Sequence, residues 1–140
     1  MKKAICIVLC ILLGGALIVC AAVGFGSNVR NAETRDVPSE LYTQEDIDSA
    51  IEQIKREFAL GWRGCELLEI YYAGDEMTSA CQEWAERYGA DEAIVLMSSF
   101  KVNKRDSAAT LNEGATYRQW NWILVRSDGG KWKHVDHGFI

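Results

Sequence analysis

The sequence lacks the short motifs that mark the common enzyme classes, and it is poor in several residue types. It contains one Pro and two His. There is no G-x-S-x-G sequence for a nucleophilic Ser, no P-loop for phosphates, and no C-x-x-C pair for redox or zinc chemistry. The sequence Gly24-Phe25-Gly26 lies in an apolar stretch and is no dinucleotide fingerprint. We therefore expect no cofactor, and nucleophilic and phosphoryl-transfer enzymes are poorly supported.

A concentration of positive charge is also missing. The chain has 15 Lys and Arg residues against 20 Asp and Glu residues, which gives a formal net charge of −5. Phosphate contacts need clustered cations, so we expect no nucleic-acid partner. The 140 residues, 49% of them hydrophobic and 25% charged, have the ordinary composition of a globular protein. That length fits one domain.

One long apolar run is present at the start of the chain. Residues 4–26 carry no charge, and Lys2 and Lys3 precede them. A helix of this length spans roughly 30 Å, which is the thickness of the hydrocarbon core of a bilayer. The positive-inside rule then places the rest of the chain outside the cytoplasm. We expect residues 4–26 to contact the membrane, and we expect an extracytoplasmic location for the domain that follows.

The fate of residues 1–26 stays open between three alternatives, all of which export the domain. The segment is an uncleaved membrane anchor, or a signal sequence cleaved near Cys20, or a lipoprotein signal. Residues 17–20 resemble a lipobox, in which Cys20 would be lipidated, although Val19 departs from the small residue preferred before that Cys. The protein is accordingly expected in the cell membrane, or else secreted or lipid-anchored.

The polar composition of residues 27–41 predicts a flexible linker, followed by one domain over residues 42–140. Cys65 and Cys81 are the two Cys residues outside the apolar run. In an exported domain they permit one disulfide. The alternative is a pair of buried thiols, because two Cys residues have no diagnostic spacing.

Hydrophobic periodicity predicts an α+β domain. Thr43 and Asp46 resemble a capping box, and apolar residues at helical spacing continue to a stop at Gly61. The elements expected after this helix are a strand over 65–73, a helix over 76–88, and strands over 92–102, 117–126 and 131–140. The order helix-strand-helix-strand-strand-strand predicts a curved, mostly antiparallel sheet with helices packed on one face.

Three stretches carry a resemblance to a known group of proteins. They are Tyr71-Tyr72-Ala73-Gly74-Asp75-Glu76, Asp91-Glu92-Ala93-Ile94-Val95-Leu96, and the run from Trp120 to Gly138. Over residues 42–140 the chain resembles a family of uncharacterised exported or membrane-anchored domains of Gram-positive bacteria. The element order is similar to the cystatin-like and nuclear-transport-factor-2-like folds, in which a long helix packs across a curved sheet. The resemblance implies fold and location, and it implies no activity.

The last predicted hairpin contains the candidate acid–base residues. A two-residue turn at Asp128-Gly129 would place Ile123 opposite His134 and Asn121 opposite Asp136. His134, Asp136 and Asn121 would then share one face, where a carboxylate beside an imidazole favours its charged form. The alternative is a hydrogen-bonded surface trio without function. A metal site is not expected, because strand alternation turns His137 away from the other two.

Three hypotheses for function follow. The lack of a catalytic motif favours a membrane-tethered, non-catalytic domain that binds a small ligand or a protein partner through its sheet face. The Trp residues of the last strands, Trp120, Trp122 and Trp132, are candidates for ligand contact, or else belong to the core. The second hypothesis is a small enzyme that uses an Asp136–His134 acid–base pair in a cone-shaped pocket. The third is an envelope accessory protein that associates with copies of itself.

Overall fold

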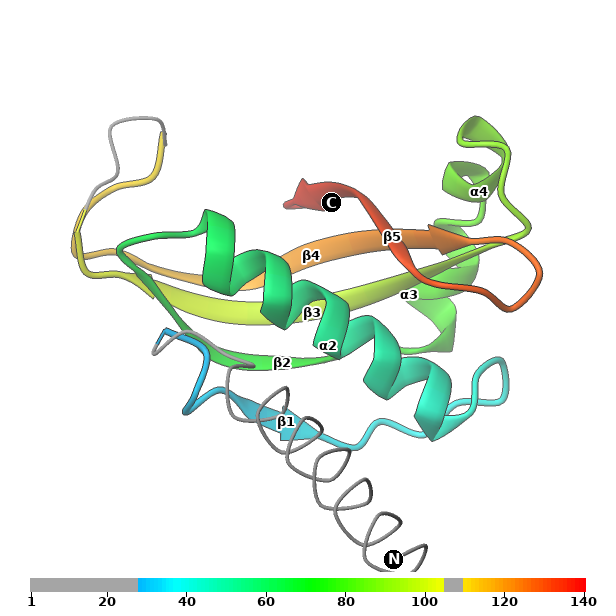
Figure 1. The fold of residues 1–140 in the computed structure, drawn as a ribbon, viewed down its shortest axis with the longest axis horizontal. Helices are drawn as coiled ribbons and strands as arrows, with labels where there is room; N and C mark the ends of the chain where they lie inside the picture. Colours follow the sequence, from blue (N-terminus) through cyan, green and yellow to red (C-terminus); the bar gives the residue numbers. More distant parts are fainter. Residues whose placement is uncertain (1–27, 105–109) are drawn as a thin grey trace, which may run out of the picture.

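A five-stranded mixed sheet organises the chain, with the strands in the order β1-β2-β3-β4-β5 (Figure 1). The computed structural model describes residues 28–104 and 110–140. The strands are β1 (Glu33–Arg35), β2 (Cys65–Tyr72), β3 (Glu92–Val102), β4 (Thr116–Arg126) and β5 (Lys133–Gly138). β1 runs parallel to β2, and the other neighbouring strands are antiparallel. The predicted α+β class and the mostly antiparallel sheet are therefore confirmed.

The long helix α2 (Gln44–Gly61) lies across one face of the sheet (Figure 1). It begins where the sequence predicts, at a capping box. The Thr43 hydroxyl accepts a hydrogen bond from the Asp46 backbone N–H, and the Asp46 carboxylate accepts one from the Thr43 backbone N–H. Its buried side chains recur every three or four residues and end at Phe58. This spacing forms one apolar stripe, and the rest of the helix meets solvent.

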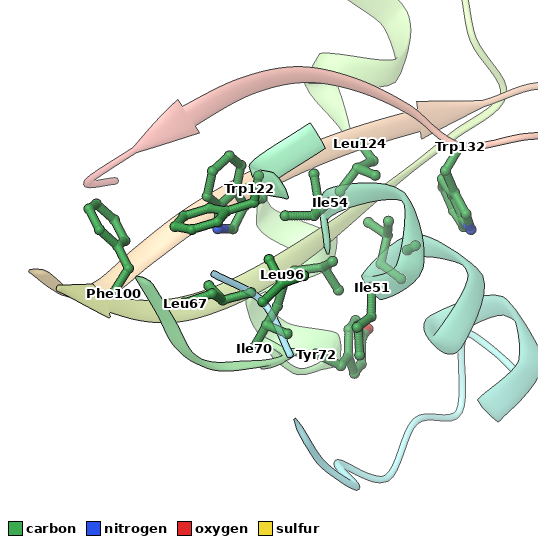
Figure 2. Packing of buried hydrophobic residues seen from close by; sticks show 14 of the residues in the cluster. Ile51, Ile54, Leu67, Ile70, Tyr72, Leu96, Phe100, Trp122, Leu124 and Trp132 are labelled. Carbon is green, nitrogen blue, oxygen red and sulfur yellow. The ribbon is translucent and has the colours of Figure 1, made fainter. Parts of the chain in front are cut away.

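The main core lies between α2 and the sheet (Figure 2). Strands β3 and β4 contribute four fully buried side chains that point towards the helix: Ile94, Leu96, Trp122 and Leu124. Trp122 also donates from its indole nitrogen to the Ser98 hydroxyl at 2.8 Å, so its polar atom is satisfied inside the core. Burial of side chains of this size stabilises the fold by about 1.5–3 kcal/mol each.

Two short helices cover part of the opposite face. They are α3 (Asp75–Ala80) and α4 (Glu83–Arg87), and they pack on the alternate residues of the central strands, such as Val95 and Ile123. The prediction that the helices lie on one face is wrong, and so is the prediction of a single helix over 76–88. The break falls at Cys81 and Gln82, where the side-chain amide of Gln82 pairs with both backbone groups of Ala93 on β3.

Part of the segment predicted to be a flexible linker belongs to the fold. Val29 is 3% exposed and lies in the main core, and β1 pairs with β2 between Glu33 and Arg35. The Ser39 hydroxyl and the Glu40 backbone also donate to the Asp75 carboxylate. A parallel pairing of three residues has no local sequence signal, since each residue pairs with one 36 positions further along the chain. The linker prediction is therefore wrong for these residues.

The predictions for residues 1–26 fall outside the described part of the chain. This applies to the anchor or signal segment and to the lipidation of Cys20. Within residues 28–104 and 110–140, no helix has both the length and the hydropathy that a membrane crossing requires. The disulfide permitted by the sequence does not form between Cys65 and Cys81, because both are buried and they pack in different clusters.

The hairpin between β4 and β5 differs from its predicted register. The tight turn forms as expected, with positive φ angles at Asp128 and Gly129. Pairing then resumes only at Val125 and Lys133, because Trp132 turns inward and donates to the Asp46 carbonyl oxygen on α2. An extra residue in β5 forms a bulge before Asp136. Such a bulge reverses the face of every residue that follows it.

Candidate functional site

The bulge in β5 separates the three residues that the sequence grouped as an acid–base site. Before the bulge His134 pairs with Leu124, and after it Asp136 pairs with Ile123. Leu124 faces α2, whereas Ile123 faces α4, so His134 and Asp136 lie on opposite faces of the sheet. Within the described residues, no hydrogen bond joins the Asp136 carboxylate to His134. The predicted Asp136–His134 pair is therefore not formed.

Asn121 and Asp136 do come together, in a pocket on the α4 face. This pocket has a volume of about 250 Å³ and lies between β4, the end of β5 and the start of α4. Glu83, Trp84, Asn121, Ile123, Asp136 and Phe139 line it, and His137, Gly138 and Ile140 complete the lining. Asn121 and Ile123 are 4% and 2% exposed and are its most deeply buried members. We call this site the Asn121 pocket.

Asn121 carries a buried oxygen without a partner. Its Nδ2 donates to the backbone carbonyl oxygens of Gln119 and Gly138, at 3.3 Å each. Both partners are acceptors, so the amide cannot be rotated to exchange its oxygen and nitrogen. Oδ1 is buried and has no hydrogen-bond partner in the structure. A buried carbonyl in this state costs about 1–3 kcal/mol, and a donor supplied from the pocket would recover that cost.

The charged side chains that line the Asn121 pocket are acidic, and the imidazole of His137 is the other polar side chain in its lining. The carboxylates of Glu83 and Asp136 are exposed, and neither forms a hydrogen bond or an ion pair with another described residue. No Lys or Arg lines the pocket. The ring of Trp84 forms one wall, with the Arg87 guanidinium 4.3 Å from the ring centroid. The pocket thus presents acceptors and negative charge beside an aromatic surface.

His134 forms a different site on the α2 face. Its Nδ1 donates to Glu57 Oε2 at 2.6 Å, and its side chain is 14% exposed. His137 follows on the same face, with its Nδ1 at 3.2 Å from His134 Nε2. Glu57, His134 and His137 therefore form a connected row of three titratable side chains, which we call the His137 site. The described residues contain no group of His, Cys, Asp and Glu suited to hold a metal ion.

The protonation state of His134 decides which hydrogen bonds join Glu57, His134 and His137. The Asp136 backbone oxygen, 3.1 Å from His134 Nε2, can only accept a hydrogen bond. A cationic His134 therefore donates to Glu57 and to Asp136, whereas a neutral His134 accepts from His137 Nδ1. Burial lowers the pKa of His137, and the adjacent His134 lowers it further. His137 is thus neutral at pH 7, with Nε2 available as its second nitrogen.

The three Trp residues proposed for ligand contact take separate roles. Trp122 and Trp132 are 0% and 5% exposed, and both indole nitrogens donate within the protein. They are core residues. Trp120 is half-buried and its indole nitrogen has no partner. It stacks with His137 at a centroid distance of 5.9 Å and contacts Phe139 at 5.1 Å, so it extends the His137 site.

A larger hollow on the α4 face has weaker features. It has a volume of about 420 Å³ and lies beside β1 and β2, where Glu66 and Glu69 line it. Glu69 already pairs with Arg35 at 3.2 Å, and Arg35 lies on the Tyr71 ring at 3.6 Å from its centroid. No buried polar atom without a partner belongs to its lining residues. Its charges are partly balanced, and it has no buried group that calls for a ligand, so it is the weaker candidate.

Sequence reasoning missed two residues of these sites. Glu83 is the first residue of the short helix α4 and lines the pocket. The sequence predicted one continuous helix here, so the start of α4 was not foreseen. Glu57 lies beside Phe58, at the border of the apolar stripe of α2. That position was the one sequence signal that its side chain could contact the sheet. Comparisons with protein families, curated proteins and solved structures found no match.

Proposed function

We propose that the described domain is the extracytoplasmic part of a membrane-tethered, non-catalytic protein that binds a small ligand in the Asn121 pocket. The observation that carries this proposal is the partnerless Oδ1 of Asn121, in a residue 4% exposed at the base of a pocket. A buried carbonyl without a donor destabilises the free protein, and binding offers a reason for keeping it. The pocket volume of about 250 Å³ suits a ligand smaller than a drug molecule.

The location and the finer fold assignment belong to the same proposal. The support for the tether is the uncharged run over residues 4–26, with Lys2 and Lys3 before it. The support for a cystatin-like or nuclear-transport-factor-2-like fold is the long helix α2 across a mostly antiparallel sheet. A reporter enzyme that is active only after export, fused after Ile140, tests the orientation. We expect an active reporter, and an inactive one would contradict export.

The binding test uses the full-length chain in detergent micelles. Three aromatic probes of similar size are added at millimolar concentration: phenethylamine (cationic), phenethyl alcohol (neutral) and phenylpropionate (anionic). Amide NMR spectra report which residues respond. We expect saturable shifts at Trp84, Asn121 and Asp136, and no shifts at β1 on the far edge of the sheet. The absence of saturable shifts with all three probes would contradict the proposal, and so would shifts confined to Glu57 and His134, which lie outside the pocket.

A second candidate function is acid–base catalysis at His137. The observation that favours it is the Glu57–His134 hydrogen bond of 2.6 Å, continued to an exposed His137. His is the side chain that most often transfers protons in enzymes, and a carboxylate hydrogen-bonded to an imidazole fixes its orientation. The test is turnover of activated aryl esters by the full-length chain and by His137→Gln. Equal rates for the two proteins would remove this candidate.

Self-association receives less support from the structure. β5 is one edge of the sheet, and edges are the places where sheets of two chains can pair. This edge carries the bulge before Asp136 and the exposed charged side chains of Lys133 and Asp136. Bulges and charges are the features that protect natural edge strands from pairing with another chain. We therefore do not propose self-association through β5.

A further inference from the structure

The chemistry of the Asn121 pocket also indicates which kind of ligand it takes. We propose that the pocket selects a small organic amine in its ammonium form, joined to an apolar body. This inference rests on the proposed binding function and adds the ligand class to it. It follows from which groups in the pocket accept hydrogen bonds, which donate them, and where the charge lies.

Asn121 defines the hydrogen-bond requirement. Because its Nδ2 is committed to the carbonyl oxygens of Gln119 and Gly138, only Oδ1 remains for a ligand, and an amide oxygen can only accept. A ligand that satisfies Asn121 must therefore bring a donor. A carboxylate or phosphate ligand has no donor for this atom and would place its charge near buried oxygen.

Glu83 and Asp136 define the charge. Both are exposed carboxylates on the rim of the pocket, and they form no ion pair with the described residues. Hydrogen bonds between an ammonium group and a carboxylate are about twice as strong as neutral ones. An ammonium group has three donors and no acceptor, and the lining of the pocket offers acceptors on Asn121, Glu83 and Asp136. The pocket therefore favours a cation with N–H groups over a neutral donor.

The walls define the rest of the ligand. Trp84 and Ile123 provide apolar surface, and Phe139 is 65% exposed at the mouth. An indole face also attracts a cation. Arg87 already occupies a position 4.3 Å from the Trp84 ring centroid, so the ring's role is mainly apolar contact. A volume of about 250 Å³ accommodates one ring and a short chain, as in phenethylamine.

The test compares dissociation constants of the full-length chain for phenethylamine, phenethyl alcohol and phenylpropionate. We expect the amine to bind about tenfold more tightly than the alcohol, and the acid to bind most weakly. Glu83→Gln and Asp136→Asn should each weaken amine binding about threefold or more while leaving the alcohol unaffected. Glu86→Gln is the matched control, since Glu86 lies on the same helix outside the pocket and should leave all three constants unchanged.

The outcomes separate the ligand class from the function. Equal binding of the three probes with shifts at Trp84 and Asn121 would keep the binding function and overturn the amine selectivity. Preference for the acid would do the same. Amine binding that is insensitive to both Glu83→Gln and Asp136→Asn would also overturn the inference, because the charge contacts would then lie elsewhere. If none of the probes binds, the proposed function and the inference both fail.

Discussion

Asn121→Leu should make the ligand-free protein more stable. Leu has nearly the shape of Asn and carries no polar atom, so the substitution removes the buried oxygen that has no donor. The cost recovered is about 1–3 kcal/mol. The same change removes two Nδ2 hydrogen bonds, but both are long, at 3.3 Å. Their acceptors on Gln119 and Gly138 are not buried, so water can replace the amide.

The balance is a net gain of about 1 kcal/mol. Two hydrogen bonds at the weak end of their range contribute about 1 kcal/mol together, against about 2 kcal/mol recovered from the oxygen. For a domain of this size, 1 kcal/mol raises Tm by about 4–8 °C. Thermal unfolding of the full-length protein, followed by circular dichroism without ligand, measures the change. The same variant should bind phenethylamine more weakly than the unchanged chain.

Asn28 provides a matched control for this substitution. Its Nδ2 also donates to two backbone carbonyl oxygens, those of Phe58 at 3.3 Å and Trp62 at 3.4 Å. Its oxygen is not among the buried atoms without a partner. Asn28→Leu therefore loses hydrogen bonds without recovering a cost, and Tm should fall by about 4–8 °C. If Asn121→Leu lowers Tm as much as Asn28→Leu does, Asn121 is a structural residue and the reasoning is refuted.

Three further predictions concern the His137 site and the loop at Gly64. His134→Gln should raise the pKa of His137 towards 6.5, because the neighbouring His134 is one of the two causes that lower it. NMR titration of the His137 ring measures this pKa. An unchanged pKa would mean that the two rings do not interact. The lowered pKa of His137 also means that the unfolded chain binds the proton first, so stability should fall as the pH drops below about 6.5. Urea denaturation at pH 7.5 and pH 5.5 checks this sign, and a flat profile would speak against it. Gly64→Ala should destabilise the fold by about 1–3 kcal/mol, because Gly64 has φ of +80° and a Cβ there would overlap the Lys104 carbonyl oxygen. Chemical denaturation measures this cost, and a neutral result would contradict the close approach of the two loops.

Local signals were sufficient for much of the fold. The capping box at Thr43 and the apolar spacing that ends at Phe58 predicted α2, and the continuous apolar run after Glu92 predicted β3. Each of these elements is specified by neighbouring residues. β1 could not be predicted in this way, because its three residues are exposed and their partner strand lies far along the chain.

The candidate site depended on a feature that the sequence does not mark. Asn121 was recognisable as a polar residue inside an apolar run. Its predicted partners were wrong in part, because one extra residue in β5 turns His134 towards Glu57 while Asp136 stays on the α4 face. The bulge depends on tertiary contacts: Val135 packs against the α4 clusters while His134 contacts α2. A strand pattern alone, with its strict alternation, cannot contain that information.

The most direct test of the account observes the Asn121 carbonyl itself. The side-chain carbonyl carbon of Asn121, followed by NMR in the full-length protein, responds when Oδ1 begins to accept a hydrogen bond. As phenethylamine saturates the protein, we expect this resonance to move downfield in step with the Trp84 indole signal. If the amine saturates the protein and the Asn121 carbonyl resonance stays where it is, the buried oxygen is not the ligand's partner, and the central claim is wrong.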